Sequence, residues 1–154
     1  MIIDQAQQFL AAQGVDQWQD GYPNEAVMRG DIGDQTAYVF EVNGAVAAIA
    51  TLVLTGEPTY ARVFGGAWTT PEPYACIHRV AVSSETRGTG VAGEMMRALE
   101  GLVRDRGVWS VRIDTHHDNR PMQQMLQKIG YTPCGTIYLV SGEPRIALEK
   151  SLCE

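Results

Sequence analysis

The feature that most constrains this chain is a strand-like run that leads through a polar loop into a glycine-rich turn. Residues 77–82 read Ile-His-Arg-Val-Ala-Val, and residues 87–93 read Arg-Gly-Thr-Gly-Val-Ala-Gly. Glycines at the start of a helix let backbone N–H groups converge, and those groups have no partner inside the helix. The helix dipole adds partial positive charge. The sequence therefore predicts an anion site, most often one for phosphate.

Length and composition favour one domain over residues 1–154, which is long enough to bury a core. Twelve basic and 18 acidic residues give a net charge of −6, which argues against sequence-independent binding of nucleic acid. The three cysteines are scattered without CxxC spacing, so neither a structural zinc site nor a disulfide framework is expected. No apolar run is long enough to cross a bilayer. The sequence predicts a cytoplasmic protein with no membrane partner.

Periodicity and capping residues predict an α/β (α+β) order of elements. Asn43-Gly44 separates two strand-like runs and is a strong hairpin signal. The expected helices lie at 4–13, 24–31, from 91 to before Gly107, and from a cap at Asp118 or Asn119 to Gly130. The expected strands lie around 37–42, 45–54, 74–82, 108–115, 131–140 and 145–152, with room for another at 61–68.

One interpretation of the glycine turn is a dinucleotide site. Residues 88–93 form a literal GxGxxG, and Asp114 ends the next predicted strand. Two features argue against this interpretation. Five residues, 83–87, separate the strand from Gly88, and the first half of the chain is a hairpin rather than a βαβ unit. A helix capped by glycines without any ligand is a second alternative.

The whole stretch resembles motif A of the GNAT superfamily, the acyl-CoA-dependent N-acetyltransferases. That motif is a strand, a short gap and then (Arg or Gln)-x-x-Gly-x-(Gly or Ala), which residues 87–92 fill. Motif B of the family is also matched, by Asp118-Asn119, a helix and then Gly130-Tyr131. The resemblance implies a single GNAT-like domain with a mixed, mostly antiparallel central sheet of six to seven strands, flanked by four helices.

The resemblance further implies that acetyl-CoA is the cosubstrate and that no metal is needed. Backbone amides of the turn would hold the pyrophosphate, and the pantetheine arm would pair like a strand with residues 80–82. Two strands would splay apart here, and an amide near Val80 would polarise the thioester carbonyl. Asn119 would contact the cofactor arm, cap a helix, or do both. The expected cofactor-binding residues are Val80, Ala81, Val82, Arg87, Gly88, Thr89, Gly90, Val91, Ala92, Gly93 and Asn119.

Transfer to an amine requires removal of the ammonium proton before attack, and an acid can protonate the departing thiolate. Many family members use a tyrosine as the acid, seven residues after the motif B asparagine. Leu126 stands at that position here. Cys134 and Tyr138 are alternative acids, or the thiolate leaves without protonation.

Three residues are candidates for the general base: Asp114, His78 and His116. Asp114 matches the position of a catalytic glutamate in members that resemble the ribosomal-protein alanine acetyltransferases, although aspartate is shorter. His116 would share the face of Asp114 if the strand continued, and histidine is a residue type that titrates near neutrality. Asp114 could instead be a strand-end hydrogen bonder. A metal site formed by His116, His117, Asp118 and His78 is not expected, because adjacent histidines on a strand point to opposite faces.

The resemblance implies that the N-terminal helices and the first hairpin form the acceptor pocket. Aromatic side chains together with a carboxylate suit an amine. The expected substrate-binding residues are Trp18, Tyr22, Glu41 and Trp68, with Tyr60 as a further candidate; a core role is the alternative for each aromatic.

These expectations together predict an enzyme that moves an acetyl group from acetyl-CoA to the primary amine of a small metabolite or amino-acid-like acceptor. The amine would attack directly in a ternary complex. The alternatives are a peptide or protein N-acetyltransferase, and a non-catalytic acyl-CoA-binding sensor module with the same fold. A homodimer is a further expectation from the resemblance.

Overall fold

Six strands and four helices make up the protein in a computed structural model that describes residues 1–153. The strands are β1 (Ala37–Val42), β2 (Ala45–Val53), β3 (Ala75–Val82), β4 (Ser110–Thr115), β5 (Thr132–Tyr138) and β6 (Pro144–Ser151). The helices are α1 (Ile2–Ala12), α2 (Glu25–Gly33), α3 (Val91–Asp105) and α4 (Arg120–Lys128), with a 3₁₀ turn η1 at Pro58–Tyr60.

The strands form one sheet in the order β1-β2-β3-β4-β6-β5. Every neighbouring pair is antiparallel except β3 and β4, which run parallel. This arrangement confirms the predicted single α/β domain with a mostly antiparallel sheet, and it has six strands rather than seven. No helix within residues 1–153 is long and apolar enough to cross a membrane.

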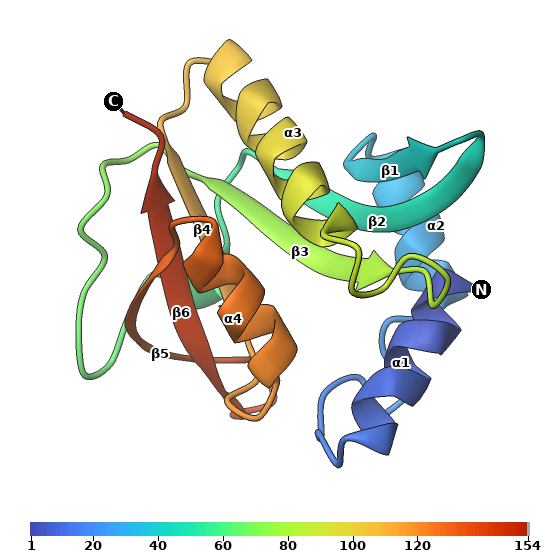
Figure 1. Cartoon of the computed structure of the whole chain (residues 1–154). Helices are drawn as coiled ribbons and strands as arrows, with labels where there is room; N and C mark the ends of the chain where they lie inside the picture. The colour runs from blue at the N-terminus through green and yellow to red at the C-terminus, as the bar shows by residue number, and fades with distance from the viewer. Residues whose placement is uncertain (154) are drawn as a thin grey trace.

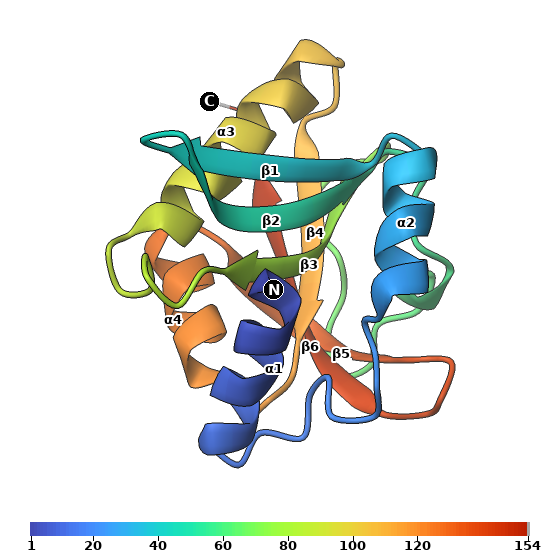
Figure 2. The same ribbon diagram turned by 90° about the vertical axis from the view of Figure 1, so that its right-hand side faces the viewer.

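Helices α3 and α4 cover one face of the sheet, and α2 lies on the other side (Figure 2). The apolar stripe of α3 packs into the main core, as its helical spacing predicts. Helix α1 lies beside the end of β3, where Ile3 and Ala6 contact Ala81. The main core includes Ile77, Met95, Met96, Leu99, Val103, Val111, Ile113, Leu126 and Leu148.

The segment between β2 and β3 covers the opposite face, around Tyr60, Cys76 and Ala147. The additional strand for which the sequence left room at residues 61–68 does not form. The described segment between β2 and β3 contains only η1 and an isolated bridge between Phe64 and Thr136. Hydrogen bonds from Thr69 and Thr70 to the Glu149 carboxylate of β6 anchor this segment to the sheet instead of a strand ladder. The indole N–H of Trp68 donates to the Tyr60 carbonyl at 2.8 Å.

Strands β3 and β4 pair at two positions in the described chain, Ala75 with Val111 and Cys76 with Arg112, and then diverge (Figure 1). This confirms the predicted splay between the two strands. On its other side β3 pairs with β2 through a register shift between Ile49 and Thr51. Between the pairs Ile49–Ala81 and Thr51–His78, the single residue Ala50 of β2 lies opposite two residues of β3, so β3 carries a bulge at residues 79–80.

Candidate active site

A cavity of about 990 Å³ lies where β3 and β4 diverge. Its walls come from α1, the loop after α1, β3, the glycine turn, the end of β4, the start of α4 and the β5–β6 loop. These segments are far apart in the sequence, and the splayed sheet brings them together. A cavity of this size is in the range that holds a cofactor or substrate.

The glycine turn forms one end of the cavity. Gly88 and Gly90 have φ angles of +81° and +87°, which residues other than glycine rarely adopt. Gly90 is also the N-cap of α3. The hydrogen bonds of residues 1–153 include none donated by the amides of Gly88, Gly90 or Ala92. Arg87 lies over the Phe9 ring at 3.9 Å, which joins the turn to α1. The turn therefore presents unpaired donors at a helix N-terminus, as an anion site requires.

The bulge in β3 is fixed by an ion pair with α2. Arg79 has a φ of +51°, an uncommon conformation for a side chain of this size. Its guanidinium donates to both oxygens of Asp31 at 2.6 Å each and to the Tyr22 hydroxyl at 2.8 Å. The Thr51 hydroxyl also donates to Asp31, at 2.7 Å. Side chains from three elements thus hold the backbone next to Val80, whose amide is the expected donor to a thioester carbonyl.

His78 lines the cavity and pairs with Glu57 from the segment after β2. The distance from His78 Nε2 to Glu57 Oε2 is 3.4 Å, and both side chains are mostly buried. The backbone N–H and hydroxyl of Thr59 donate to the other oxygen of Glu57. The hydrogen bonds with His78 and Thr59 outweigh burial and lower the pKa of Glu57 to about 2. The Glu57 carboxylate is therefore ionised and can orient the imidazole.

Asp114 also lines the cavity, at the end of β4. The Tyr60 hydroxyl donates to Asp114 Oδ1 at 2.6 Å. Burial raises the pKa of Asp114 above its ordinary value, although the hydrogen bond from Tyr60 opposes this shift. Tyr60 is itself almost completely buried, so it supports Asp114 from behind rather than facing the cavity.

Asn119 performs the structural role expected of it. Its side-chain oxygen accepts from the Met122 amide at 3.3 Å, which caps α4. Its side-chain nitrogen donates to Gln17 Oε1 at 2.8 Å, which ties the loop after α1 to the start of α4. Asn119 lines the cavity as well, so a contact with a bound ligand is compatible with both hydrogen bonds.

The structure brings most of the predicted site residues into this one cavity. Four do not line it. Thr89 turns back to bond the Thr86 carbonyl, Glu41 is exposed on β1, and Trp68 packs against Tyr60 on the covered face of the sheet. His116 is the fourth. The predicted residues that line the cavity are Trp18, Tyr22, His78, Val80, Ala81, Val82, Arg87, Gly88, Gly90, Val91, Ala92, Gly93, Asp114 and Asn119.

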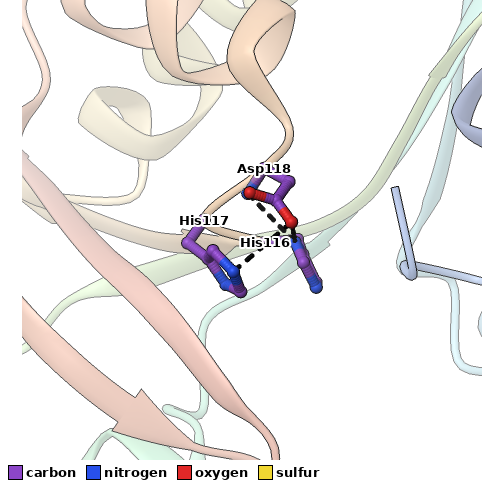
Figure 3. A group of neighbouring side chains, drawn as sticks. All are labelled: His116, His117 and Asp118. Carbon is purple, nitrogen blue, oxygen red and sulfur yellow. Dashed lines mark hydrogen bonds and ion pairs between the residues drawn. The ribbon is translucent and has the colours of Figure 1, made fainter. Parts of the chain in front are cut away.

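His116 lies in a small cluster with His117 and Asp118 (Figure 3). Strand β4 ends at Thr115, so the two histidines do not alternate; their rings stack with centroids 4.3 Å apart. The expectation that they point to opposite faces is therefore wrong. His116 Nδ1 accepts from the Asp118 amide at 3.0 Å, which occupies that lone pair. Mainly through burial, the pKa of His116 is lowered.

The residues considered as a general acid lie away from the cavity. Leu126 is fully buried in the core beneath α4. Cys134 is buried in β5, and burial raises the pKa of its thiol to about 12. Tyr138 is half exposed and packs edge-on against Phe64. None of these three side chains lines the cavity.

The sequence did not indicate Glu57 or Arg145 as site residues, nor the role of Tyr60 as the partner of Asp114. Glu57 and Tyr60 lie in an irregular segment without helical or strand periodicity, so the sequence does not predict which way their side chains point. Arg145 is buried near the start of β6 and lines the cavity. A charged residue at the first inward position of a predicted strand was the one available signal.

Comparison with known proteins agrees with this geometry. Residues 3–131 match the acetyltransferase (GNAT) family. An acetyltransferase of the GNAT family from Streptococcus agalactiae is 33% identical, with a TM-score of 0.89 over 99% of this chain and 87% of that one.

Two more distant structures share the fold. An acetyltransferase of the GNAT family from Listeria monocytogenes is 20% identical, with a TM-score of 0.71 over 98% of this chain and 86% of that one. An N-acetyltransferase from Staphylococcus aureus is 20% identical, with a TM-score of 0.58 over 83% and 74%. Among curated proteins, none matches the chain. The family match covers most of the sequence, and the chain belongs to the GNAT acetyltransferase family.

Proposed function

We propose that this protein is an acetyl-CoA-dependent N-acetyltransferase that acts on the primary amine of a small, amino-acid-like acceptor. One observation carries the proposal. One cavity lies where β3 and β4 diverge, and its walls include both the glycine turn and the side chains of His78 and Asp114. A phosphate-bearing donor and an amine could therefore meet beside the bulge in β3.

The residues present fit acetyl-CoA. The unpaired amides at Gly88, Gly90 and Ala92 suit a pyrophosphate at the N-terminus of α3. Beyond Cys76, none of the β4 residues that the structure describes pairs with β3, so the backbone of β3 is available to an extended pantetheine arm. The bulge places the Val80 amide near the divergence, where it would donate to the thioester carbonyl. When bound, acetyl-CoA supplies an acetyl group activated as a thioester.

We assign His78 as the general base, with Glu57 as the group that orients it. His78 lies two positions before Val80 and lines the cavity, so it can accept the ammonium proton directly or through a water. The ionised Glu57 stabilises the imidazolium that results. The ionised Glu57 adds negative charge at this end of the cavity, which favours a cationic acceptor.

The CoA thiolate would leave without a dedicated acid, because a thiol is acidic enough to depart as its anion. This follows from the position of Leu126, which is buried in the core instead of facing the cavity. The same observation favours one alternative function, an acyl-CoA-binding sensor that binds the cosubstrate without turning it over.

Incubation of the protein with acetyl-CoA and a panel of amines tests the proposal. Release of CoA is followed with a thiol reagent, and acetylated amines are identified by mass spectrometry. We expect transfer to at least one small amine. Tight binding of acetyl-CoA with no acetylated product from small amines or peptides would overturn the enzyme proposal and support the sensor. Transfer to peptide N-termini alone would overturn the choice of a small acceptor.

A further inference from the structure

Arg145 is a buried cation that lines the cavity near His78 and Asp114, at what we call the acceptor end. Its side chain is 7% exposed, and it lines the cavity near the start of β6. Within residues 1–153 its guanidinium donates to the neighbouring Pro144 carbonyl at 3.0 Å and approaches Glu143 at 3.8 Å. The Glu143 side chain is 48% exposed, so this ion pair is loose and easily exchanged. Burying a guanidinium with so few hydrogen-bond partners costs folding free energy unless a bound ligand supplies the missing partners.

The other two cations that line the cavity are already engaged. Arg79 is bound by Asp31 and Tyr22, and Arg87 stacks on Phe9 beside the glycine turn. Of the three arginines that line the cavity, Arg145 is thus the one whose N–H donors are free to bind a ligand, and it lies away from the glycine turn. A guanidinium presents a planar fork of donors that matches a carboxylate well.

The register of the sheet places Arg145 beside Asp114. Asp114 of β4 pairs with Ala147 of β6 in an antiparallel ladder. Residues two apart on a strand share a face, so Arg145 and Asp114 point to the same side as diagonal neighbours. The positive charge of Arg145 also acts to lower the pKa of Asp114, and so opposes the rise that burial causes. A buried cation and a half-buried carboxyl group are therefore diagonal neighbours at this end of the cavity.

We propose that Arg145 binds a carboxylate of the acceptor, so that the substrate of this enzyme is an amino acid with a free carboxyl group. This inference rests on the proposed function and narrows the acceptor from any small amine to a free amino acid. The ammonium lies toward His78, Glu57 and Asp114, and the carboxylate lies on Arg145, where it replaces Glu143. An α-amino acid carries its ammonium and carboxylate groups on the same carbon atom, which matches cationic and anionic side chains that lie close together. A peptide N-terminus has a neutral carbonyl at that position and would leave Arg145 without its partner.

The test compares kcat/KM for three matched sets: free L-amino acids, the corresponding amino-acid amides, and the amines that lack the carboxyl group. Phosphoethanolamine adds an acceptor whose anion is a phosphate. The wild-type protein should prefer the free acid over its amide by about 10- to 100-fold, the usual value of a hydrogen bond to a charged group. In Arg145→Gln this ratio should fall to about 1, chiefly through a higher KM for the acid. Arg145→Lys, which keeps the charge, should retain part of the preference.

Arg106→Gln is the matched control. Arg106 is exposed at the end of α3 and does not line the cavity, so this variant should keep the wild-type ratio. Acetyl-CoA affinity and the melting temperature of each variant report whether it folds. If Arg145→Gln does not fold, the wild-type ratio and Arg145→Lys still decide the matter.

Equal wild-type rates with acids and amides would overturn the role of Arg145 and leave the N-acetyltransferase proposal intact. An unchanged ratio in Arg145→Gln would do the same. A preference for phosphoethanolamine over every amino acid would overturn the choice of a carboxylate. No acetylated product from any amine would overturn the proposed function, and this inference with it.

Discussion

The guanidinium of Arg79 donates to both oxygens of Asp31, at 2.6 Å each, and this pair fastens helix α2 to the bulge in β3. The two residues are 48 positions apart in the sequence. Arg79 adopts a left-handed conformation that its neighbours must stabilise. The pair therefore links the position of α2 to the part of the β3 backbone that lines the cavity.

Replacing Asp31 with asparagine should reduce both stability and turnover. Because Arg79 would lose its charged partner, we expect the free energy of unfolding to fall by about 2–4 kcal/mol. This is less than for a fully buried pair, since Arg79 keeps 16% of its side chain exposed. Turnover should fall by about tenfold or more, with little change in KM for acetyl-CoA, because the bulge amide would shift.

The control is Glu25→Gln on the same helix. It removes an ion pair with Arg29 in which both side chains are mostly exposed. Stability should change by no more than about 0.5 kcal/mol, and turnover should stay the same. Urea denaturation and initial rates measure both variants. Asp31→Asn with the wild-type kcat would show that the bulge does not need this ion pair.

Gly90→Glu should abolish binding of acetyl-CoA. The change places a carboxylate at the N-cap of α3, among the amides that are expected to hold the pyrophosphate, and forces a side chain into a φ of +87°. We expect the Kd measured by calorimetry to rise by about 100-fold or more, which corresponds to nearly 3 kcal/mol. Gly101→Glu makes the same substitution in mid-helix, where a Cβ meets nothing within 4 Å, and should leave the Kd unchanged.

Two substitutions separate the candidate bases. His78→Ala should lower kcat/KM by about 100-fold or more if His78 removes the proton. The deficit should shrink as the pH rises, because more of the amine is then already deprotonated. Asp114→Asn keeps the acceptor oxygen for Tyr60 and should cost less. A larger deficit for Asp114→Asn than for His78→Ala, in pH–rate profiles of both, would move the role to Asp114.

Glu149 gives the fold a predictable response to acid. Burial alone would raise the pKa of Glu149, but hydrogen bonds from the amides and hydroxyls of Thr69 and Thr70 outweigh it and lower the pKa to about 2. A depressed folded-state pKa means that the stabilisation is present above the unfolded value of 4.5 and is lost as the pH falls toward 2.

Glu149→Gln should therefore be less stable than the wild type by about 1–3 kcal/mol near neutral pH. The difference should narrow as the pH is lowered from 4.5 toward 2. Glu41→Gln, on an exposed residue of β1, should behave like the wild type throughout. Melting temperatures across this range measure the effect, and a constant difference between Glu149→Gln and wild type would contradict the assigned pKa.

Local patterns predicted the part of the site that depends on adjacent residues. The turn at residues 87–93 follows a strand and opens a helix in the structure as the sequence indicates. The Asn43-Gly44 hairpin is confirmed, with both residues at positive φ. Both features are decided by backbone conformations that glycine and asparagine favour, so their positions follow from residue type alone.

The acceptor end could not be predicted in the same way. Glu57 and Tyr60 lie in a segment without periodicity, and their partners His78 and Asp114 belong to two different strands. Whether Glu57 reaches His78 and Tyr60 reaches Asp114 depends on where β3 and β4 diverge, which the local sequence does not show. His116 shows the opposite error: one residue beyond the end of β4, the alternation of side chains no longer holds.

Coupled measurement of both products of the wild-type protein tests the central claim most directly. CoA release and acetylated amine are quantified in the same reaction, with acetyl-CoA and the panel of free amino acids, and Gly90→Glu serves as the negative control. The account predicts one acetylated amine for each CoA released, and neither product with Gly90→Glu. CoA release without acetylated amine, or equal turnover by Gly90→Glu, would contradict it.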